Sequence, residues 1–417
     1  MRDNRKVFRY NAALICAFLL AFTNVAFGQS DSTAAKKVLQ MVNEVRLKFA
    51  PDKRTDIFNA QVNNLQPLIV TLETTVPAAA ITLQKHLSAT DIPLVLRTDT
   101  LPAKELQGKI FGVANLSVSN NRISPGNAPE MVTQMLLGTP VTILKTQRGY
   151  SLVRTPDRYI SWVDNSAITP MDAAAFVAWR DAAKVIYTNQ YGHAYQQASR
   201  SSLPVSDLVA GDILQFHGKK ADFYEVAFPD GRIAYIPVNE AADYQKWLDK
   251  PKPDAAKILA TAQTLIGVPY LWGGTSIKGV DCSGFTKTAY FLNGIILPRD
   301  ASQQALVGKE VDIYEADSVS NAKCLKNLQP GDLLFFSPGI RQGRQAKITH
   351  TGIYMGNGQF IQSAGMVKIN SLDPKAANYD DYRRQRLVVA RRMLTSVGEP
   401  GIVKVSDHPF YHSTSKK

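Results

Sequence analysis

The segment that most constrains the fold reads Gly273-Gly-Thr-Ser-Ile-Lys-Gly-Val-Asp-Cys-Ser-Gly-Phe285, a glycine-rich loop followed by an apolar pattern. Apolar residues at i, i+4 and i+7 from Phe285 predict a helix that starts near Cys282 and ends at Gly294. The unpaired N–H groups and the dipole at such a helix end favour a thiolate and would stabilise an oxyanion. We therefore predict that Cys282 is a nucleophile.

The alternative for Cys282 is a buried, inert cysteine, which is common in protein cores. The surrounding glycines and the adjacent Asp281 and Ser283 argue against that alternative. Cys324 has no such context, so we predict a structural role for it and expect Cys282 to be alkylated faster. Apart from Cys16, these are the only cysteines, fewer than an exported protein that depends on disulfides usually carries. A single bridge between the two remains the other interpretation.

A nucleophilic thiol needs a base, and His350 is the best placed of the six histidines. Residues 347–355 alternate like a strand, and Gly356-Asn-Gly358 turns the chain into a second strand that carries Gln362. A two-residue turn would put His350 and Gln362 on opposite faces of the sheet. A three-residue turn changes the parity and places Gln362 opposite Gly352, on the face of His350. The Gln362 amide oxygen would then orient the imidazole, the third role of a triad.

The N-terminus has the pattern of a cleaved export signal. Four basic residues precede an apolar run at residues 12–22, and Ala26 and Gly28 bracket a cleavage site before Gln29. The run is shorter than the roughly 20 apolar residues of a membrane span. We expect export to the periplasm, with the cell surface as the alternative. The net charge of +13 falls to about +10 without the signal, and in an exported protein this favours an anionic wall polymer over nucleic acid.

A repeat organises the middle of the chain, where short alternating runs between turn residues predict two small β-barrels. The segment Tyr150–Asp157 aligns without a gap with Phe223–Asp230, 73 residues later. Residues 33–49 have the spacing of an amphipathic helix, and the alanine-rich stretch at 170–186 predicts a helical connector.

These patterns divide the chain into six segments. They are a signal peptide at 1–28, a short N-terminal helical region of unclear role at 29–105, a first barrel at 106–170, the connector and a second barrel at 171–248, a last α+β unit at 255–395 after the linker prolines Pro251 and Pro253, and a polar tail at 396–417 that carries His408 and His412.

The last unit contains five motifs in a fixed order. They are Pro269-Tyr-Leu-Trp-Gly-Gly274, Asp281-Cys-Ser-Gly284, Leu297-Pro-Arg-Asp-Ala-Ser-Gln303, Gln329-Pro-Gly-Asp-Leu-Leu-Phe-Phe336 and His350-Thr-Gly-Ile-Tyr354. Together they resemble the NlpC family of cell-wall cysteine peptidases. The resemblance implies a papain-like α+β fold, a Cys–His–polar triad, and cleavage of peptidoglycan stem peptides at the γ-D-glutamyl–diamino acid bond. This family often has a histidine where this chain has Gln362, and an amide orients the imidazole less strongly.

The two barrels before this unit resemble a subgroup of recycling endopeptidases with paired bacterial SH3-like domains. In that subgroup the first barrel binds the free amine of an N-terminal L-alanine, and Glu130 and Tyr159 match those contacts by position. A carboxylate facing an ammonium in a partly closed site is physically sensible. The alternative for both residues is an exposed barrel side chain. The pocket residues of the peptidase domain in that subgroup match Tyr270, Asp281, Ser283 and Asp300.

Two other functions stay open at this point. A non-catalytic wall-binding protein with a degenerate peptidase domain is opposed by the intact Cys282 and His350, while Gln362 leaves it some room. Amidase or acyltransferase chemistry on another acyl substrate is the second alternative. No His, Cys and carboxylate cluster has ligand spacing, so we expect no metal and no cofactor. The pattern does not determine the oligomeric state, or whether the diamino acid is diaminopimelate or lysine.

Overall fold

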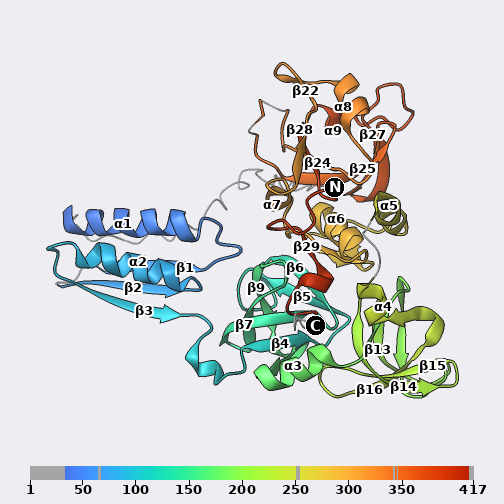
Figure 1. The fold of residues 1–417 in the computed structure, drawn as a ribbon, viewed down its shortest axis with the longest axis horizontal. Coiled ribbons are helices and arrows are strands. Elements are labelled where there is room, and N and C mark those ends of the chain that lie inside the picture. The colour runs from blue at the N-terminus through green and yellow to red at the C-terminus, as the bar shows by residue number, and fades with distance from the viewer. Residues whose placement is uncertain (1–32, 64–66, 250–253, 341–342, 345, 413–417) are drawn as a thin grey trace, which may run out of the picture.

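The computed structural model describes residues 33–412 except 64–66, 250–253, 341–342 and 345. The predicted signal peptide at 1–28, the linker prolines Pro251 and Pro253, and the last five residues lie outside the described residues. Four units follow one another along the chain. The N-terminal unit lies at the left of Figure 1, the last unit lies at the top, and the two sheets formed by residues 111–243 lie side by side below the last unit.

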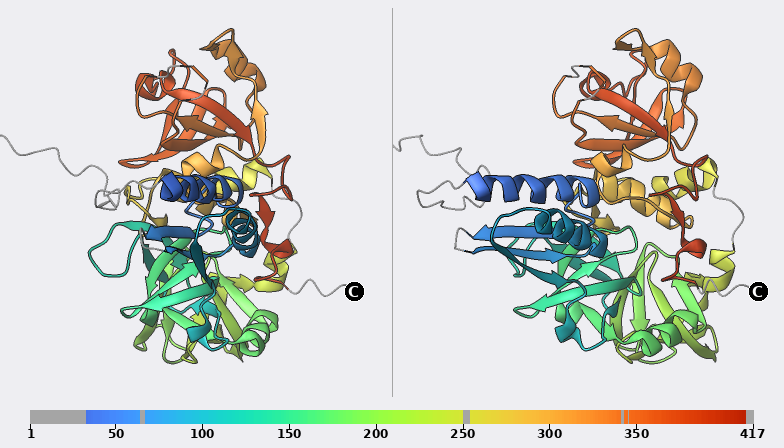
Figure 2. Two further views of the ribbon diagram at one scale, coloured as in Figure 1. Left: turned by 90° about the vertical axis from the view of Figure 1, so that its left-hand side faces the viewer. Right: turned by 60° about the vertical axis from the view of Figure 1, so that its left-hand side comes forward.

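The N-terminal unit is a two-layer α/β structure, so the prediction of a short helical region was wrong. The helix predicted at 33–49 is confirmed as α1. The strand at Leu68–Thr74 has alternating buried residues and pairs with a strand on each side. Both helices cover one face of a three-stranded sheet, and Val38, Leu72 and Leu83 are buried between the layers (Figure 2). Its elements are α1 (Thr33–Phe49), β1 (Phe58–Asn63), β2 (Leu68–Thr74), α2 (Pro77–Ser88), β3 (Leu94–Thr100) and the short η1 (Lys104–Leu106).

Two seven-stranded sheets of the same topology follow, which confirms the repeat. Their orders are β10-β4-β7-β8-β9-β5-β6 and, reversed, β17-β11-β14-β15-β16-β12-β13, so every strand has its counterpart seven strands later. Each strand of the second sheet also begins 73 residues after its counterpart. The repeat therefore extends over the whole of both units, which we name the first and second β-units.

The bounds of the first β-unit are β4 (Phe111–Ala114), β5 (Val118–Arg122), β6 (Met131–Leu136), β7 (Pro140–Gln147), β8 (Tyr150–Arg154), β9 (Ile160–Asp164), η2 (Asn165–Ala167) and β10 (Ile168–Met171), followed by α3 (Ala173–Asp181). Those of the second are β11 (Lys184–Tyr187), β12 (Tyr191–Tyr195), β13 (Pro204–Val209), β14 (Ile213–Lys220), β15 (Phe223–Ala227), β16 (Ile233–Pro237), η3 (Val238–Glu240) and β17 (Ala241–Asp243), followed by α4 (Tyr244–Leu248). The predicted connector helix is shorter than 170–186 because strands occupy both of its ends.

The last unit is a six-stranded antiparallel sheet with the order β21-β28-β24-β25-β26-β27. Helix α6 packs against β25 and β26 and buries Phe285, Ala289 and Tyr290 against sheet residues such as Ile353 and Ile361. The helix begins at Cys282, as the sequence predicts, and Gly294 follows it with a φ of +81°, which suits glycine.

The bounds in this unit are α5 (Ala255–Gln263), β18 (Thr275–Ser276), β19 (Gly279–Val280), α6 (Cys282–Phe291), β20 (Ile295–Ile296), α7 (Ala301–Gln304), β21 (Lys309–Val311), β22 (Tyr314–Glu315), β23 (Ser318–Val319), α8 (Asn321–Asn327), β24 (Leu333–Phe336), β25 (His350–Gly356), β26 (Gln359–Ala364), β27 (Met366–Ser371), α9 (Asp381–Arg384) and β28 (Leu387–Arg392), with β29 (Val403–Lys404) and η4 (Val405–Asp407) near the C-terminus.

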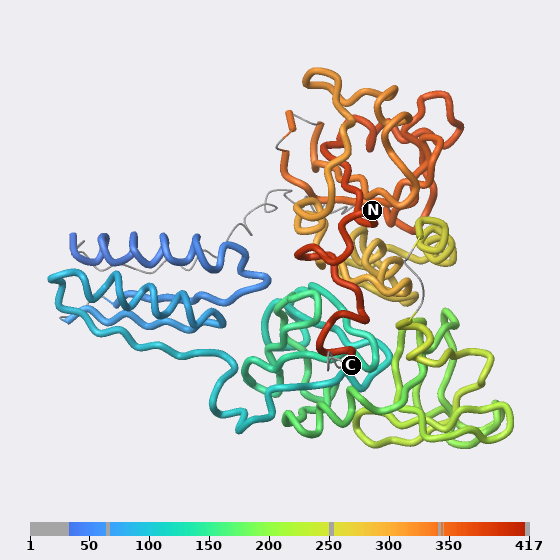
Figure 3. The backbone as a smooth tube through the Cα atoms, in the orientation of Figure 1, coloured from blue at the N-terminus to red at the C-terminus, as the bar shows by residue number. Residues whose placement is uncertain are grey.

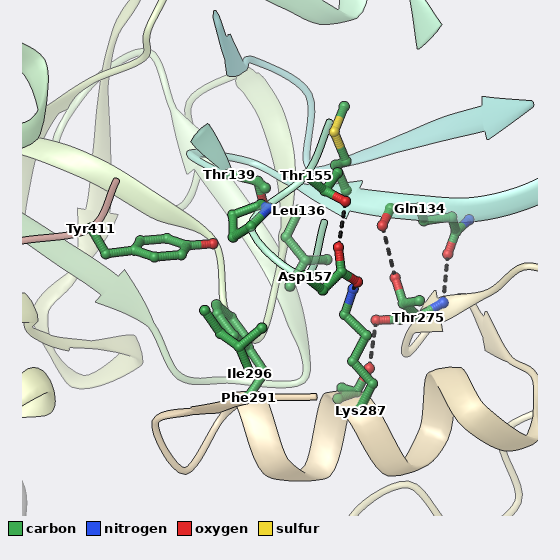
Figure 4. Close-up of a pocket in the computed structure, with 13 residues that line it drawn as sticks. Gln134, Leu136, Thr139, Thr155, Asp157, Thr275, Lys287, Phe291, Ile296 and Tyr411 are labelled. Carbon is green, nitrogen blue, oxygen red and sulfur yellow. Dashed lines mark hydrogen bonds and ion pairs between the residues drawn. The ribbon is translucent and has the colours of Figure 1, made fainter. Parts of the chain in front are cut away.

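The first β-unit is docked on helix α6 (Figure 4). Lys287 of α6 reaches Asp157 in the turn after β8, and the Asp157 side chain is only 1% exposed. Beside this ion pair, the Thr275 N–H donates to Gln134 Oε1 at 2.9 Å, and Tyr411 points into the same contact. The pocket at this contact has a volume of about 50 Å³. Because a buried carboxylate without its cation is costly, this contact holds the β-unit against α6.

The segment from residue 396 was predicted to be a polar tail, and for its described part this prediction was wrong. Residues 396–412 run from the last unit down to the first β-unit (Figure 3). On the way β29 pairs with β20, and Ile402, Val405 and Tyr411 are buried. The apolar residues are too few and too widely spaced to show a pattern in the sequence. Ile402 packs in the core of the last unit, whereas Val405 and Tyr411 pack between Ile296 of the last unit and residues of the second β-unit.

We expect Ile402→Ala to lower the free energy of unfolding by about 2–5 kcal/mol, because Ile402 is fully buried and the truncation leaves a cavity. The matched control is Ile340→Ala, which removes the same atoms from a side chain that is 65% exposed and should change stability by less than about 0.5 kcal/mol. Urea denaturation of the two variants measures the difference. Equal destabilisation would show that the C-terminal segment does not contribute to the folded core.

Candidate active site

Asp281 links the glycine-rich loop to helix α6. Its Oδ1 accepts from the Gly284 N–H at 2.7 Å, which caps the helix, and its Oδ2 accepts from the Gly273 N–H at 2.9 Å. The loop and helix touch so closely that a Cβ at position 284 would lie 2.0 Å from the Gly274 carbonyl oxygen. Cys282, the first helical residue, is thereby held at a fixed place.

Arg299 completes this arrangement, and the sequence analysis missed it. Its guanidinium donates to both oxygens of Asp281, at 3.1 and 2.6 Å, and to Ser283 Oγ at 3.1 Å. Its Nε donates to Thr133 Oγ1 of β6 at 2.8 Å, so it also binds the first β-unit. Arg299 is 1% exposed. The sequence signal that could have identified Arg299 is its place beside Asp300 in the 297–303 motif. An arginine buried there needs a carboxylate partner, and Asp281 is that partner.

The Cys282 thiol is buried beside the start of strand β25, and its Sγ donates to the Thr349 carbonyl at 4.0 Å. Burial raises the pKa of Cys282 to about 11, and the neighbouring Asp281 acts in the same direction, while hydrogen bonds to the backbone of Thr351 and Ser283 oppose them. Burial therefore acts against the thiolate that the helix end was expected to favour, and the thiolate state of Cys282 stays a prediction.

His350 and Gln362 lie on the same face of the sheet, as predicted, with His350 Nε2 2.6 Å from Gln362 Oε1. The geometric reason differs from the expected three-residue turn. The turn has two residues with positive φ, Asn357 and Gly358, and an irregularity between Tyr354 and Gly356 supplies the extra residue. The bulge changes the parity, so the register Ile353↔Ile361 brings Gln362 to the His350 face.

The Gln362 amide is oriented by three further side chains. Its Nε2 donates to Asn370 Oδ1 at 2.8 Å and to Asp380 Oδ2 at 3.2 Å, and its Oε1 accepts from Arg383 Nε at 3.1 Å. The oxygen therefore faces His350, whose Nε2 donates to it, and the lone pair remains on Nδ1. The sequence analysis missed these three partners, because they come from β27 and α9, after the last motif.

Burial lowers the pKa of His350 to about 3, and the nearby Arg383 cation lowers it further, whereas the bond to Gln362 raises it. The imidazole is therefore neutral at physiological pH and can accept a proton. The Cys282 thiol contacts the backbone on both sides of His350, at the Thr349 carbonyl and the Thr351 N–H, so this imidazole is the candidate general base for the thiol. Arg383 stacks 5.8 Å from the Phe336 ring, and Phe336 in turn lies 5.7 Å from the His350 ring.

The other predicted site residues gather at the boundary with the first β-unit. Glu130 Oε1 accepts from Trp272 Nε1 at 2.7 Å, which brings the predicted amine ligand to the 269–274 motif. Burial raises the pKa of Tyr159, and the negative charge of Asp300 contributes. Burial also raises the pKa of Tyr270, with a contribution from Cys282. Glu130, Tyr159 and Tyr270 therefore lie close to the motifs of the last unit: Glu130 at Trp272, Tyr159 near Asp300 and Tyr270 near Cys282.

Asp281 and Ser283 differ from these residues because both are buried and bonded to Arg299. Their contacts position the loop and helix, and a direct role in substrate binding stays a prediction. Among the described residues, no group of histidine, cysteine or carboxylate side chains could hold a metal ion. In the same residues, Cys282 and Cys324 are both free thiols. No described helix combines the length and hydrophobicity that a membrane span requires.

A buried thiol at a helix start, next to an imidazole held by an amide, is the arrangement of a cysteine-type peptidase. Residues 267–392 match the NlpC/P60 family model, and this part of the chain belongs to the NlpC/P60 family. Residues 121–168 match the bacterial dipeptidyl-peptidase Sh3 domain. The chain is thus a peptidase of the cysteine type, with an SH3 domain in its first β-unit.

Several known proteins are similar to this chain. A γ-D-glutamyl-L-lysine dipeptidyl-peptidase of Bacillus cereus is 29% identical over 253 residues, which are 57% of this chain and 68% of the relative. Dipeptidyl-peptidase 6 of Lysinibacillus sphaericus is 27% identical over 63% of this chain and 92% of its own length. The crystal structure of an NlpC/P60 family protein from Bacillus cereus has a TM-score of 0.56 at 24% identity, covering 68% of this chain and 99% of that one.

We expect Gln362→Ala to slow alkylation of Cys282 at neutral pH by about 10- to 100-fold, a part of the effect that a positioned general base provides. Without the amide, His350 loses the bond that fixes its ring and its tautomer. Gln359→Ala is the matched control, because Gln359 lies on the same strand and bonds Asn378 instead. Similar rates in both variants would contradict the orienting role of Gln362.

The pH dependence of the same reaction tests the resting state of the thiol. With a pKa of about 11, the Cys282 alkylation rate should rise steadily between about pH 7 and pH 10. The measurement uses iodoacetamide and a Cys324→Ser variant, because burial raises the pKa of Cys324 to about 11 as well. A rate that is already constant from about pH 5 would reveal a thiolate–imidazolium pair instead.

Proposed function

We propose that this protein is an exported endopeptidase that hydrolyses the γ-D-glutamyl–diamino acid bond of peptidoglycan stem peptides, with Cys282 as nucleophile and His350 as base. The observation that carries the proposal is the 2.6 Å bond between His350 Nε2 and Gln362 Oε1, because it leaves the Nδ1 lone pair of His350 free to accept a proton, while the Cys282 thiol contacts the neighbouring Thr349 carbonyl. A degenerate, non-catalytic domain would have no need to keep this pair and its four supporting side chains.

In the first half of the reaction, His350 Nδ1 takes the Sγ proton while the sulfur attacks the γ-carbonyl carbon of D-glutamate. Backbone N–H groups in the first turn of α6 stabilise the oxyanion, because they have no carbonyl partner within the helix. His350 then donates its proton to the departing α-amine of the diamino acid, the C–N bond breaks, and a thioester remains. Water attacks the thioester, His350 accepts a proton from it, and Cys282 leaves as the thiol.

The substrate assignment rests on the relatives and on the charges at the site. The Bacillus cereus relative is named for a bond between γ-D-glutamate and L-lysine, and the first β-unit matches a domain of bacterial dipeptidyl-peptidases. Glu130 and Asp300 supply carboxylates near the loop, which suits the ammonium of a free N-terminal L-alanine. Tyr159 and Tyr270 flank this region. A peptide still attached to muramic acid has no N-terminal ammonium on its L-alanine, so it would bind poorly.

We also infer that the last unit has a papain-like arrangement and that the second β-unit is a second SH3-like barrel, because its strand order repeats that of the first. The export signal expected at residues 1–28 supports a periplasmic location, where fragments of the wall are released. The diamino acid is diaminopimelate or lysine, and the diaminopimelate peptide is the first substrate to test.

Incubation of the protein with L-Ala-γ-D-Glu-diaminopimelate should release L-Ala-D-Glu, detected by mass spectrometry, and Cys282→Ala should release none. The N-acetylated peptide is the control, and we expect it to be cleaved at least about 10-fold more slowly, because it offers no ammonium to the carboxylates. Cleavage by the Cys282→Ala protein would contradict the mechanism. No cleavage by either protein under reducing conditions would favour a wall-binding protein.

A further inference from the structure

The N-terminal unit reaches the candidate active site through residues 52–56, which we name the junction segment. On one side it bonds the first β-unit, where the Ile160 N–H donates to the Arg54 carbonyl at 2.7 Å and Arg158 pairs with Asp56 at 3.1 Å. On the other side it bonds the last unit, where Gln303 Nε2 donates to Asp52 at 2.9 Å. The segment therefore bridges the first β-unit, which carries the predicted amine ligands Glu130 and Tyr159, and the last unit, which carries the predicted pocket residue Asp300.

Arg54 is the residue of this segment that touches the site. Its Nη1 donates to Asp300 Oδ2 and to Ser302 Oγ, each at 2.9 Å. Its Nε and Nη2 donate to both oxygens of Asp52, at distances from 2.7 to 3.1 Å. Four of its five N–H groups are thus used by the protein, and the guanidinium is held in one orientation by a bidentate partner.

Asp300 keeps room for another cation. Asp300 is the N-cap residue of helix α7, and its backbone carbonyl accepts from the Gln303 N–H at 2.9 Å. The Arg54 bond uses about one of the four lone-pair positions of its carboxylate. Its side chain is 28% exposed, and on its buried side it interacts with Arg299. Because Asp52 balances the charge of Arg54, the group of Asp52, Arg54, Asp300, Arg299 and Asp281 carries a net charge of −1, which an ammonium would neutralise.

We propose that Arg54 is a positioning residue for the amine subsite: it holds the Asp300 carboxylate, ionised and correctly oriented, for the N-terminal ammonium of the substrate. This inference rests on the proposed function and gives the N-terminal unit a role in specificity. A guanidinium that competed with the ammonium would need free donors aimed at the subsite, whereas Arg54 is bonded to Asp52 and Ser302 as well as to Asp300.

The electrostatics of Asp300 support this role. Burial raises the pKa of Asp300, and the cations Arg299 and Arg54 act against it. Loss of Arg54 should therefore move the pKa of Asp300 further up, so that a larger fraction of the carboxyl group is protonated and uncharged at mildly acidic pH. A neutral carboxyl group binds an ammonium weakly, so KM for a free-amine peptide should rise as pH falls.

The test compares Arg54→Gln, Arg54→Lys and the control Arg158→Gln on L-Ala-γ-D-Glu-diaminopimelate. Arg158→Gln breaks an ion pair of the same segment without touching Asp300. We expect Arg54→Gln to raise KM roughly 10-fold, with kcat changed less than about threefold, and to move the acid limb of kcat/KM to higher pH. Arg54→Lys keeps the charge and should restore most of the effect, and Arg158→Gln should leave both quantities unchanged.

A lower KM in Arg54→Gln would overturn the proposal and show that Arg54 competes with the ammonium. An unchanged KM with an unmoved acid limb would overturn it too. If the unaltered protein cleaves no peptide, the proposed function fails, and calorimetry on Cys282→Ala proteins still decides the inference. A peptide with a propionyl group in place of L-alanyl lacks the N-terminal ammonium. When Arg54 is present, this peptide should bind at least about 10-fold more weakly than the L-alanyl peptide, and without Arg54 the difference should disappear. An equal difference in affinity without Arg54 would overturn the inference.

Discussion

The buried carboxylate of Asp281 is the constraint on which the site depends. With two acceptor oxygens it caps helix α6, fixes the glycine-rich loop through Gly273 and pairs with Arg299, which in turn binds Thr133 of the first β-unit. An unpaired charge at this depth would cost several kcal/mol, so loop, helix and β-unit are expected to move together. The position of Cys282 is thereby set by electrostatics as much as by the fold of its own unit.

Burial also sets the chemistry of the reacting pair. Desolvation raises the pKa of Cys282 and lowers that of His350, so burial disfavours the charged form of both groups. Charge would develop only during proton transfer and attack, where the first turn of α6 offers N–H groups to the oxyanion. Arg383 contributes by orienting the Gln362 amide and by adding positive charge close to the imidazole.

The duplicated β-units show how one fold can serve a site in one copy only. With the 73-residue offset of their strands, Glu130 corresponds to Leu203 and Tyr159 to Arg232. The first copy faces the glycine-rich loop and carries the carboxylate and the phenol. The second copy has the same strand order, but its equivalent positions bear an exposed leucine and an arginine that binds the Asn115 carbonyl of the first unit at 2.7 Å. The two units therefore share a topology but differ in the side chains that they carry at these positions.

The amino-acid sequence alone determined those features that depend on local patterns. The helix beginning at Cys282, the 73-residue repeat and the helix at 33–49 follow from glycine placement and from the spacing of apolar residues. Only the tertiary structure decided what depends on contacts between distant segments. It showed the bulge before Gly356 that brings His350 and Gln362 to one face, the α/β fold of the N-terminal region, the packing of residues 396–412, and the bonds that Arg299, Arg383 and Arg54 make. The physical reason is that burial and charge pairing are properties of the assembled fold, and residues separated by up to about 250 positions carry no periodic signal of their contact.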